Sequence, residues 1–290
     1  MIAGLMMVLQ GAPVATRTGT FQSRRITESS GVAVSRAHPG VLWTHNDSGD
    51  GPYLYATDLS GGDLGAVLVP GAEAVDWEDI ALAACPDQPG DCLYIADTGD
   101  NLERRSSVSL YVVPEPDPPT GPADTLGTTA APLVIHLVYP DGRHDVEAVY
   151  VGVRDTAVYL VSKGRHGPIR LYRVPRQVWK SAGSSKADRI MAELVQDLPI
   201  DPAPVLGRWV TAAAERSDGR VVAIRTYTEI YFFTPGEGGR LKPASSSPCP
   251  LFGLEPQGEG VDFLDDSTLV LTSESASAGP APIHTIRCSS

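Results

Sequence analysis

Short segments of apolar or alternating apolar and polar residues run along most of the chain, separated by turns rich in Gly, Pro, Asp and Asn. Alternation with a period of two is typical of half-buried β-strands, because successive side chains point to opposite faces of a sheet. Clear examples span 41–45, 92–95, 158–163, 221–226 and 268–274. Only residues 176–198 have helical character, and we expect them to form a surface insertion. The pattern predicts an all-β fold.

Two sequence elements recur along the chain. Asn-Asp-Ser-Gly-Asp at 46–50 returns 50 residues later as Ala-Asp-Thr-Gly-Asp at 96–100, and each copy follows an apolar run. The second element has a polar residue, a Ser or Glu two positions later, and a β-branched residue two positions after that. Its copies begin at Glu28, Asp76, Asp145 and Gln257, with a degenerate copy at Arg208. Because each copy precedes a strand, a turn and another apolar strand, the chain is built from a repeated unit.

The spacing between the Ser or Glu positions of the second element, which we call its slot, gives the length of the repeated unit. The slot falls at Ser30, Glu78, Glu147, Val210 and Glu259, with spacings of 48, 69, 63 and 49 residues. Units of this size are typical of a β-propeller, in which each blade buries its faces only against its neighbours. We expect four-stranded antiparallel blades, five in number. The alternative is a propeller with a degenerate sixth blade within 114–140 or 176–208.

The N-terminal residues predict a leader and a closing strand. Residues 2–9 are apolar and 12–15 are small, as at the end of a signal peptide, although no Lys or Arg precedes Arg17. We therefore expect residues 1–16 to be a leader or a truncated signal peptide. Residues 17–290 are expected to form a single domain, in which 18–26 supply the outer strand of the last blade and close the ring.

The four cysteines predict two disulfide bonds. Cys85 and Cys92 bracket a short Pro- and Gly-containing loop, and Cys249 is available to pair with Cys288 near the C-terminus. Buried free thiols are the alternative, and no Cys/His cluster has the spacing of a zinc site. Because disulfides persist in oxidising compartments, we expect a secreted protein or one of the periplasm or cell envelope.

The amino-acid composition indicates which kinds of partner the protein can bind. The 290 residues include 23 Lys and Arg against 35 Asp and Glu, and the net charge of −12 repels nucleic acid. A hydrophobic fraction of 42% is sufficient for a sizeable core, yet no stretch after the N-terminal residues approaches the length of a membrane span. We expect a monomer without a membrane span that binds a small molecule and no nucleic acid.

Propeller topology predicts that the acidic residues of both elements converge. The first strand of each blade starts at the face of the ring where the second strand ends, so both elements lie at one mouth of the central channel. Asp76 and Asp145 belong to this acidic ring. Our candidate metal ligands are Glu28, Asp47, Glu78, Asp97, Asn101, Glu147 and Glu259. Oxygen ligands without thiolates suit a hard cation, Ca²⁺ first, with Mg²⁺ or Mn²⁺ possible.

Cationic and basic side chains complete the candidate site. Lys163 and Arg225 end second strands at the same mouth, where they could bind an anionic group of a small-molecule ligand. His45 and Glu147 are candidate general bases. The alternative is structural, because acids at such turns also hydrogen-bond backbone amides and join blades, and the two cations could simply pair with the acids. No Gly-x-Ser-x-Gly motif occurs, which argues against a serine hydrolase.

Several motifs carry a resemblance to known propellers. They are Glu28-Ser-Ser-Gly-Val-Ala, Trp43-Thr-His-Asn-Asp-Ser-Gly, Asp76-Trp-Glu-Asp-Ile-Ala, Leu93-Tyr-Ile-Ala-Asp-Thr-Gly-Asp-Asn, Asp145-Val-Glu-Ala-Val and Tyr159-Leu-Val-Ser-Lys. Over residues 26–175 the chain resembles a group of secreted bacterial β-propeller proteins, mostly of unassigned role. More distantly, it is similar to the phytase-like esterase and gluconolactonase/strictosidine-synthase propellers. The resemblance implies a Ca²⁺-type ion at the channel mouth, held by Glu and Asn/Asp, with ester, lactone or phosphoester hydrolysis in some members.

Two functions are consistent with these features. The first is an extracytoplasmic, metal-dependent hydrolase of an ester, a lactone or a phosphoester. The chain lacks the dense Lys and Arg of the phytase pattern, which argues against phosphate release. The second is a non-catalytic binding or scaffold propeller with a structural Ca²⁺ ion, because one fold hosts many unrelated functions.

Overall fold

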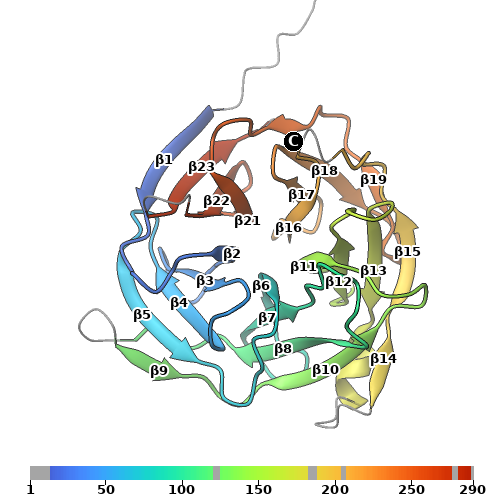
Figure 1. The fold of residues 1–290 in the computed structure, drawn as a ribbon, viewed down its shortest axis with the longest axis horizontal. Helices are drawn as coiled ribbons and strands as arrows, with labels where there is room; N and C mark the ends of the chain where they lie inside the picture. The colour runs from blue at the N-terminus through green and yellow to red at the C-terminus, as the bar shows by residue number, and fades with distance from the viewer. Residues whose placement is uncertain (1–13, 120–124, 182–187, 204–206, 276–279, 289–290) are drawn as a thin grey trace, which may run out of the picture.

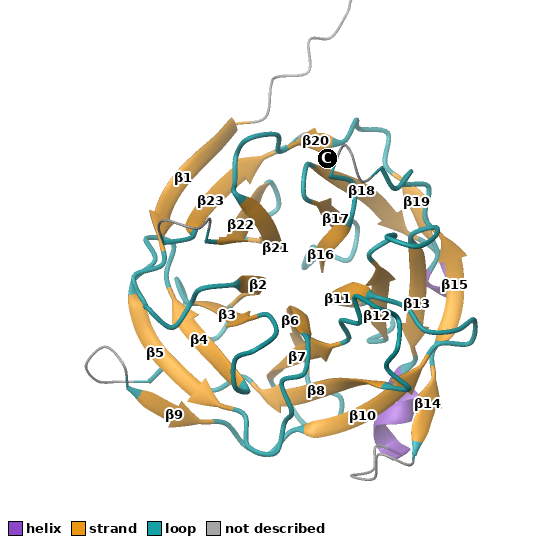
Figure 2. Cartoon of the chain, in the orientation of Figure 1, coloured by secondary structure: helices purple, strands orange, loops and turns teal. Residues whose placement is uncertain are grey.

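The computed structural model describes residues 14–119, 125–181, 188–203, 207–275 and 280–288, which form a five-bladed β-propeller (Figure 1). In each blade the first strand lies nearest the central axis and the last lies at the circumference (Figure 2). The predicted all-β fold and the five-blade count are confirmed. None of the described helices has the length or the apolar character needed to cross a bilayer.

The blades follow one another along the chain. The first contains β2 (Ser29–Val34), β3 (Leu42–Asn46), β4 (Tyr53–Thr57) and β5 (Asp63–Leu68). The second contains β6 (Trp77–Ala84), β7 (Asp91–Asp97), β8 (Val108–Pro114) and β10 (Leu133–Val138). The third contains β11 (Val146–Val151), β12 (Val158–Ser162), β13 (Arg170–Val174) and β15 (Glu193–Asp197). The fourth contains β16 (Val210–Glu215), β17 (Val222–Thr226), β18 (Glu229–Pro235) and β19 (Leu241–Pro243). β20 (Cys249–Pro250) also pairs with β18.

The last blade joins the two ends of the chain. It contains β21 (Gln257–Phe263), β22 (Thr268–Glu274), β23 (Pro282–Arg287) and β1 (Val14–Thr20). β1 runs antiparallel to β23 as the outermost strand. It overlaps the closing strand expected at 18–26 only over 18–20, and it includes residues 14–16 of the expected leader. Residues 1–13 lie outside the described chain.

The long intervals between repeats add strands to existing blades. β9 (Leu126–Thr128) pairs in parallel with β5, and β14 (Arg189–Met191) pairs in parallel with β10. Two short 3-10 helices, η1 (Arg176–Ser181) and η3 (Glu237–Gly239), lie between strands. The segments that were candidates for a sixth blade therefore extend the first, second and third blades in the described part of the chain.

The hydrophobic core is divided among the interfaces between blades. Five clusters of buried apolar side chains each combine residues from two neighbouring blades, including the pair that closes the ring. Trp77 of the second blade, for example, is buried with Trp43 of the first. Each blade thus depends on both neighbours for its core, as the repeat predicted.

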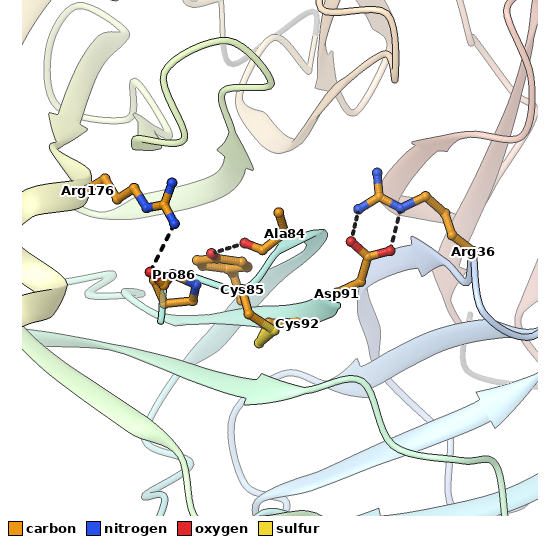
Figure 3. The surroundings of a disulfide bond; sticks show 8 residues. Arg36, Ala84, Cys85, Pro86, Asp91, Cys92 and Arg176 are labelled. Carbon is orange, nitrogen blue, oxygen red and sulfur yellow. Dashed lines mark hydrogen bonds and ion pairs between the residues drawn. A yellow bond between two sulfur atoms is a disulfide. The ribbon is translucent and has the colours of Figure 1, made fainter. Parts of the chain in front are cut away.

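Both predicted disulfides are present. Cys85–Cys92 closes the turn between β6 and β7, and Cys249–Cys288 joins the fourth blade to the C-terminal end of the fifth. Figure 3 shows the first bridge between two polar contacts: the Arg176 guanidinium donates to the Pro86 carbonyl, and the Arg36 guanidinium binds the Asp91 carboxylate. The first disulfide therefore holds a hairpin that contacts both the first and the third blade.

Candidate metal-binding site at the channel mouth

Every first strand is irregular near its start. The pairing register with the second strand shifts just after Ser29, Trp77, Val146, Val210 and Gly258. The residues that follow these positions are Ser30, Glu78, Glu147, Thr211 and Glu259, so the slot assigned to Val210 belongs to Thr211. A β-bulge re-aims the side chain that it carries. The repeat therefore presents one polar side chain per blade at equivalent positions around the channel.

The two hydroxyl members of this ring join blades. Ser30 Oγ donates to the Glu78 carbonyl at 2.6 Å, and Thr211 Oγ1 donates to the Glu259 carbonyl at 3.0 Å. Asp79 has a similar structural role, since its carboxylate accepts the Val149 and Ala213 N–H groups from the next two blades. These contacts account for some of the buried polar residues without any function in binding.

Five acids gather into two overlapping groups. One carboxylate oxygen from each of Asp47, Asp76 and Glu78 lies within 4.8 Å of the other two. The same holds for Glu78, Asp145 and Glu147. We call these the first and second acid triads, which share Glu78. Of the candidate metal ligands, the structure thus brings together Asp47, Glu78 and Glu147.

Lys163 supplies a positive charge to the second triad. Its Nζ lies 2.8 Å from Glu147 Oε1, and both side chains are buried. Burial lowers the pKa of Lys163, but Glu147 and other nearby acidic groups outweigh it and raise that pKa above its usual value. Burial raises the pKa of Glu147, an effect that Lys163 opposes. Lys163 therefore lies beside the acids as a cation, as predicted, and it is already paired with Glu147.

Burial and neighbouring acids disfavour the ionised forms of Glu78 and Asp76. Burial, then Glu147 and Asp47, raise the pKa of Glu78 well above its usual range. Burial, then Asp47 and Asp145, raise the pKa of Asp76 to about 7. Carboxylates in such proximity need a counter-charge or a proton to remain together at neutral pH.

The polypeptide leaves room for this concentration of oxygen atoms. A Cβ atom on Gly99 would overlap Glu78 Oε1 and lie 2.5 Å from Asp76 Oδ2, so any larger residue would displace these two carboxylates. Asp145 Oδ2 is buried without a hydrogen bond to any described residue, and Arg165 Nε lies 4.0 Å from it. A set of carboxylate oxygens with an unpaired member suits Ca²⁺, Mg²⁺ or Mn²⁺. The residues present therefore fit the expected hard cation.

Asp97 and Asn101 are outside both triads. Asp97 accepts the Asp76 N–H at 3.0 Å and pairs with Arg105 at 3.0 Å, while Asn101 is exposed. Strand pairing gives the reason. Ser29 pairs with Asn46 as Trp77 pairs with Asp97, so Asn46 and not Asp47 is the counterpart of Asp97. The two similar motifs are therefore offset by one residue in the fold.

Glu28 and Glu259 lie on another side of the mouth, also outside the triads. Glu28 forms a backbone bridge with Glu274, and Glu259 Oε1 accepts a hydrogen bond from Gln257 at 3.1 Å. Burial and the nearby Glu274 raise the pKa of Glu259 to about 8. Burial, then Asp47 and Glu28, raise the pKa of Glu274 to about 7. Glu259 and Glu274 therefore form a second pair of acids with raised pKa values.

His45 and Arg225 are held inside the blades. His45 is buried, its Nδ1 lies 2.9 Å from the Asn46 carbonyl oxygen, and burial lowers its pKa to about 4. Arg225 is also buried, donates to the Thr272 carbonyl and pairs with Glu255. A histidine in this state is neutral at pH 7, and this arginine is already neutralised.

Tyr227 is a residue of the mouth that the sequence analysis missed. Val210 pairs with Thr226 as Val146 pairs with Ser162, so Tyr227 and not Arg225 is the counterpart of Lys163. Burial, then Glu259, raises the pKa of Tyr227, so its hydroxyl stays protonated. Like Lys163, Tyr227 directly follows the second strand of its blade, and this shared position could have identified it.

Neither a protein-family model nor a curated protein sequence matches the chain. Among solved structures, the PQQ-bound aldose sugar dehydrogenase of Streptomyces coelicolor has a TM-score of 0.55 at 13% identity, over 96% of this chain and 99% of that one. A gluconolactonase of Xanthomonas campestris has a TM-score of 0.45 at 13% identity, over 94% of this chain and 89% of that one. The likeness is one of fold. The match to the aldose sugar dehydrogenase agrees with the β-propeller fold inferred from the motifs.

Proposed function

We propose that the channel mouth binds one divalent cation and hydrolyses a small ester or lactone. The observation that carries this proposal is the pair of acid triads that share Glu78, next to the ion pair between Glu147 and Lys163. The first triad, Asp47, Asp76 and Glu78, would hold the cation, with Asp145 on the other side of Glu78. Ca²⁺ is the first candidate, and Mg²⁺ or Mn²⁺ are the others. When bound, such a cation supplies Lewis acidity that polarises a carbonyl oxygen.

Glu147 acts as the general base in this proposal. Its raised pKa brings it closer to the operating pH, where proton transfer is most efficient. Lys163 orients the carboxylate through the 2.8 Å contact between Nζ and Oε1. Tyr227, protonated and partly buried, donates a hydrogen bond to an oxygen of the substrate. We assign no catalytic role to His45 and Arg225 in this proposal, because each is held by backbone or side-chain partners within the blades.

The charges at the mouth favour a neutral substrate over a phosphoester. The triads contain five carboxylates, and the nearby cations already have anionic partners: Lys163 pairs with Glu147, and Arg105 with Asp97. A dianionic phosphate would therefore meet net repulsion unless the cation alone compensated for it. A lactone or a carboxylic ester avoids this cost.

We further propose that the protein works outside the cytoplasm. Two disulfides connect all four cysteines of the chain. Such bonds persist in the oxidising environment of the periplasm or the cell exterior. Expression with and without export, followed by thiol titration, tests this point, and one free thiol per exported chain would contradict it.

Hydrolysis assays test the function directly. Short-chain aryl esters, lactones and aryl phosphates are offered to chelated protein supplemented with Ca²⁺, Mg²⁺ or Mn²⁺. We expect metal-dependent hydrolysis of an ester or lactone, and a loss of about 10²–10⁴-fold in kcat for Glu147→Gln, as for other general bases. Glu193→Gln, on the exposed outer strand β15, is the matched control and should retain full activity.

The outcomes separate the two functions. Metal binding without any hydrolysis would support the alternative, a binding or scaffold propeller with a structural cation. Hydrolysis that Glu147→Gln leaves unchanged would exclude the proposed base. Activity that persists after complete chelation would exclude the role of the cation.

A further inference from the structure

A second cavity lies at the end of the channel opposite the acid triads. The first strands start at the acidic mouth and end at Val34, Ala84, Val151, Glu215 and Phe263. All five of these terminal residues line a cavity of about 360 Å³. The volume falls in the range of small-molecule pockets, about 300–1,000 Å³. No triad residue lines this cavity, so it is a separate candidate site.

Apolar side chains form about half of the lining of this cavity. Leu82, Val151, Phe263 and Leu264 line it, and Val153, whose exposed fraction is 45%, stands at its edge. This apolar part of the wall offers no ligands to a metal ion. It does suit the hydrocarbon part of an organic molecule.

The charged residues around the cavity are mostly acidic. Arg36 is the cation among the described lining residues, and its Nε and Nη2 donate to both carboxylate oxygens of Asp91, at 2.9 and 2.7 Å (Figure 3). Asp262 accepts the Val34 and Phe263 N–H groups, one on each oxygen. Asp265 accepts N–H groups from its own turn. These three carboxylates are already hydrogen-bonded within the protein.

Glu215 differs from the other acids. Its Oε2 accepts the Val153 N–H at 2.9 Å, while Oε1 has no hydrogen-bond partner among the described residues. Burial and the neighbouring Asp155 and Asp218 outweigh the Val153 N–H and Arg154, and they raise the pKa of Glu215 to about 7. A cation placed at Oε1 would stabilise this carboxylate. The cavity therefore combines a partly apolar wall with one carboxylate oxygen that has no hydrogen-bond partner among the described residues, and its charged residues are mostly acidic.

We propose that this cavity binds a small organic cation, an ammonium group on an apolar stem. The ammonium group donates to Glu215 Oε1, and the stem packs against Leu82, Val151 and Phe263. Charge complementarity selects the amine over a carboxylate of the same length. The proposal is independent of the chemistry at the acidic mouth.

Calorimetric titration with n-hexylammonium tests the proposal, with hexanoate and hexanol as probes of equal length. We expect binding of hexylammonium alone, weakened about tenfold to a hundredfold in Glu215→Gln, as for the loss of a hydrogen bond to a charged group. Ser217 is exposed and lines the cavity, so Ser217→Trp should block the entrance without changing the core. This second variant tests the proposal even if Glu215→Gln fails to fold. Glu193→Gln should bind normally.

Glu78→Gln separates this cavity from the acidic mouth. Hexylammonium binding that is retained in Glu78→Gln and weakened in Glu215→Gln and Ser217→Trp supports the proposal. Binding that is lost in Glu78→Gln but unchanged in the other two variants would assign the amine to the mouth and overturn it. Equal binding of hexanoate, or no binding of the amine, would also overturn it.

Discussion

Removing divalent cations should lower the melting temperature of this protein at neutral pH. Four other carboxylates are concentrated around Glu78, and burial raises the pKa of Glu78 itself, so the folded mouth is strained without a counter-charge. Unfolding separates these acids and releases the strain. A cation that binds only the folded chain therefore stabilises it by mass action.

The magnitude follows from the occupancy of the site. At a free cation concentration 100 times the dissociation constant, the gain in unfolding free energy is about 2.7 kcal/mol. One kcal/mol shifts the melting temperature of a chain of about 150–250 residues by about 2–4 °C. We therefore expect chelation to lower the melting temperature by about 5–10 °C, reversibly on adding Ca²⁺.

Differential scanning calorimetry of two matched variants locates the effect. Glu78→Gln removes the carboxylate that both triads share, so most of the shift on adding Ca²⁺ should disappear. Glu259→Gln removes the equivalent side chain of another blade, which lies outside both triads, and should retain the shift. A wild-type melting curve that chelation leaves unchanged would contradict a cation at the triads, and so would a Glu78→Gln response to Ca²⁺ equal to that of the wild type.

Three further predictions follow from the packing and the electrostatics. Metal-free protein should lose stability as pH rises through about 8, because folding raises the pKa of Glu259 from the ordinary value of about 4.3. The contribution of protonated Glu259 to the unfolding free energy is complete below about pH 4.3. The melting temperature of Glu259→Gln should therefore depend less on pH than that of the wild type. Gly99→Ala should cost about 1–3 kcal/mol in chemical unfolding and weaken Ca²⁺ binding, because its Cβ would displace two triad carboxylates; normal Ca²⁺ affinity would contradict this. Replacing both cysteines of the Cys249–Cys288 bridge by Ser should destabilise by about 4 kcal/mol, against about 2 kcal/mol for the bridge between β6 and β7, because it closes the longer loop; equal losses in urea unfolding would exclude the loop-length argument.

The sequence was sufficient to predict the five blades because the innermost strands repeat. Each of these strands is buried between two neighbours, so its apolar residues and its polar slot are strongly constrained. The outermost strand carries no such constraint. β1 is mostly exposed, and its sequence, Val-Ala-Thr-Arg-Thr-Gly-Thr, has little apolar alternation. Its bounds were therefore misplaced although its role in closing the ring was expected.

The candidate site was predictable where strand topology positions the side chain. Glu78 and Glu147 occupy the same bulge in two blades, so their convergence with Asp47 follows from the repeat. Asp97 and Arg225 were matched to other residues by sequence similarity, but strand pairing gives each a different counterpart. An offset of one or two residues changes which side chain reaches the mouth, and it depends on bulges that the sequence pattern does not reveal.

Anomalous diffraction from crystals grown with Mn²⁺ shows whether the first acid triad holds a cation. We predict one anomalous peak at the acidic mouth, within about 2.0–2.6 Å of oxygens from Asp47, Asp76 and Glu78, and no such peak in Glu78→Gln. A map without a peak at these carboxylates, at a Mn²⁺ concentration that saturates the melting temperature, would contradict the account.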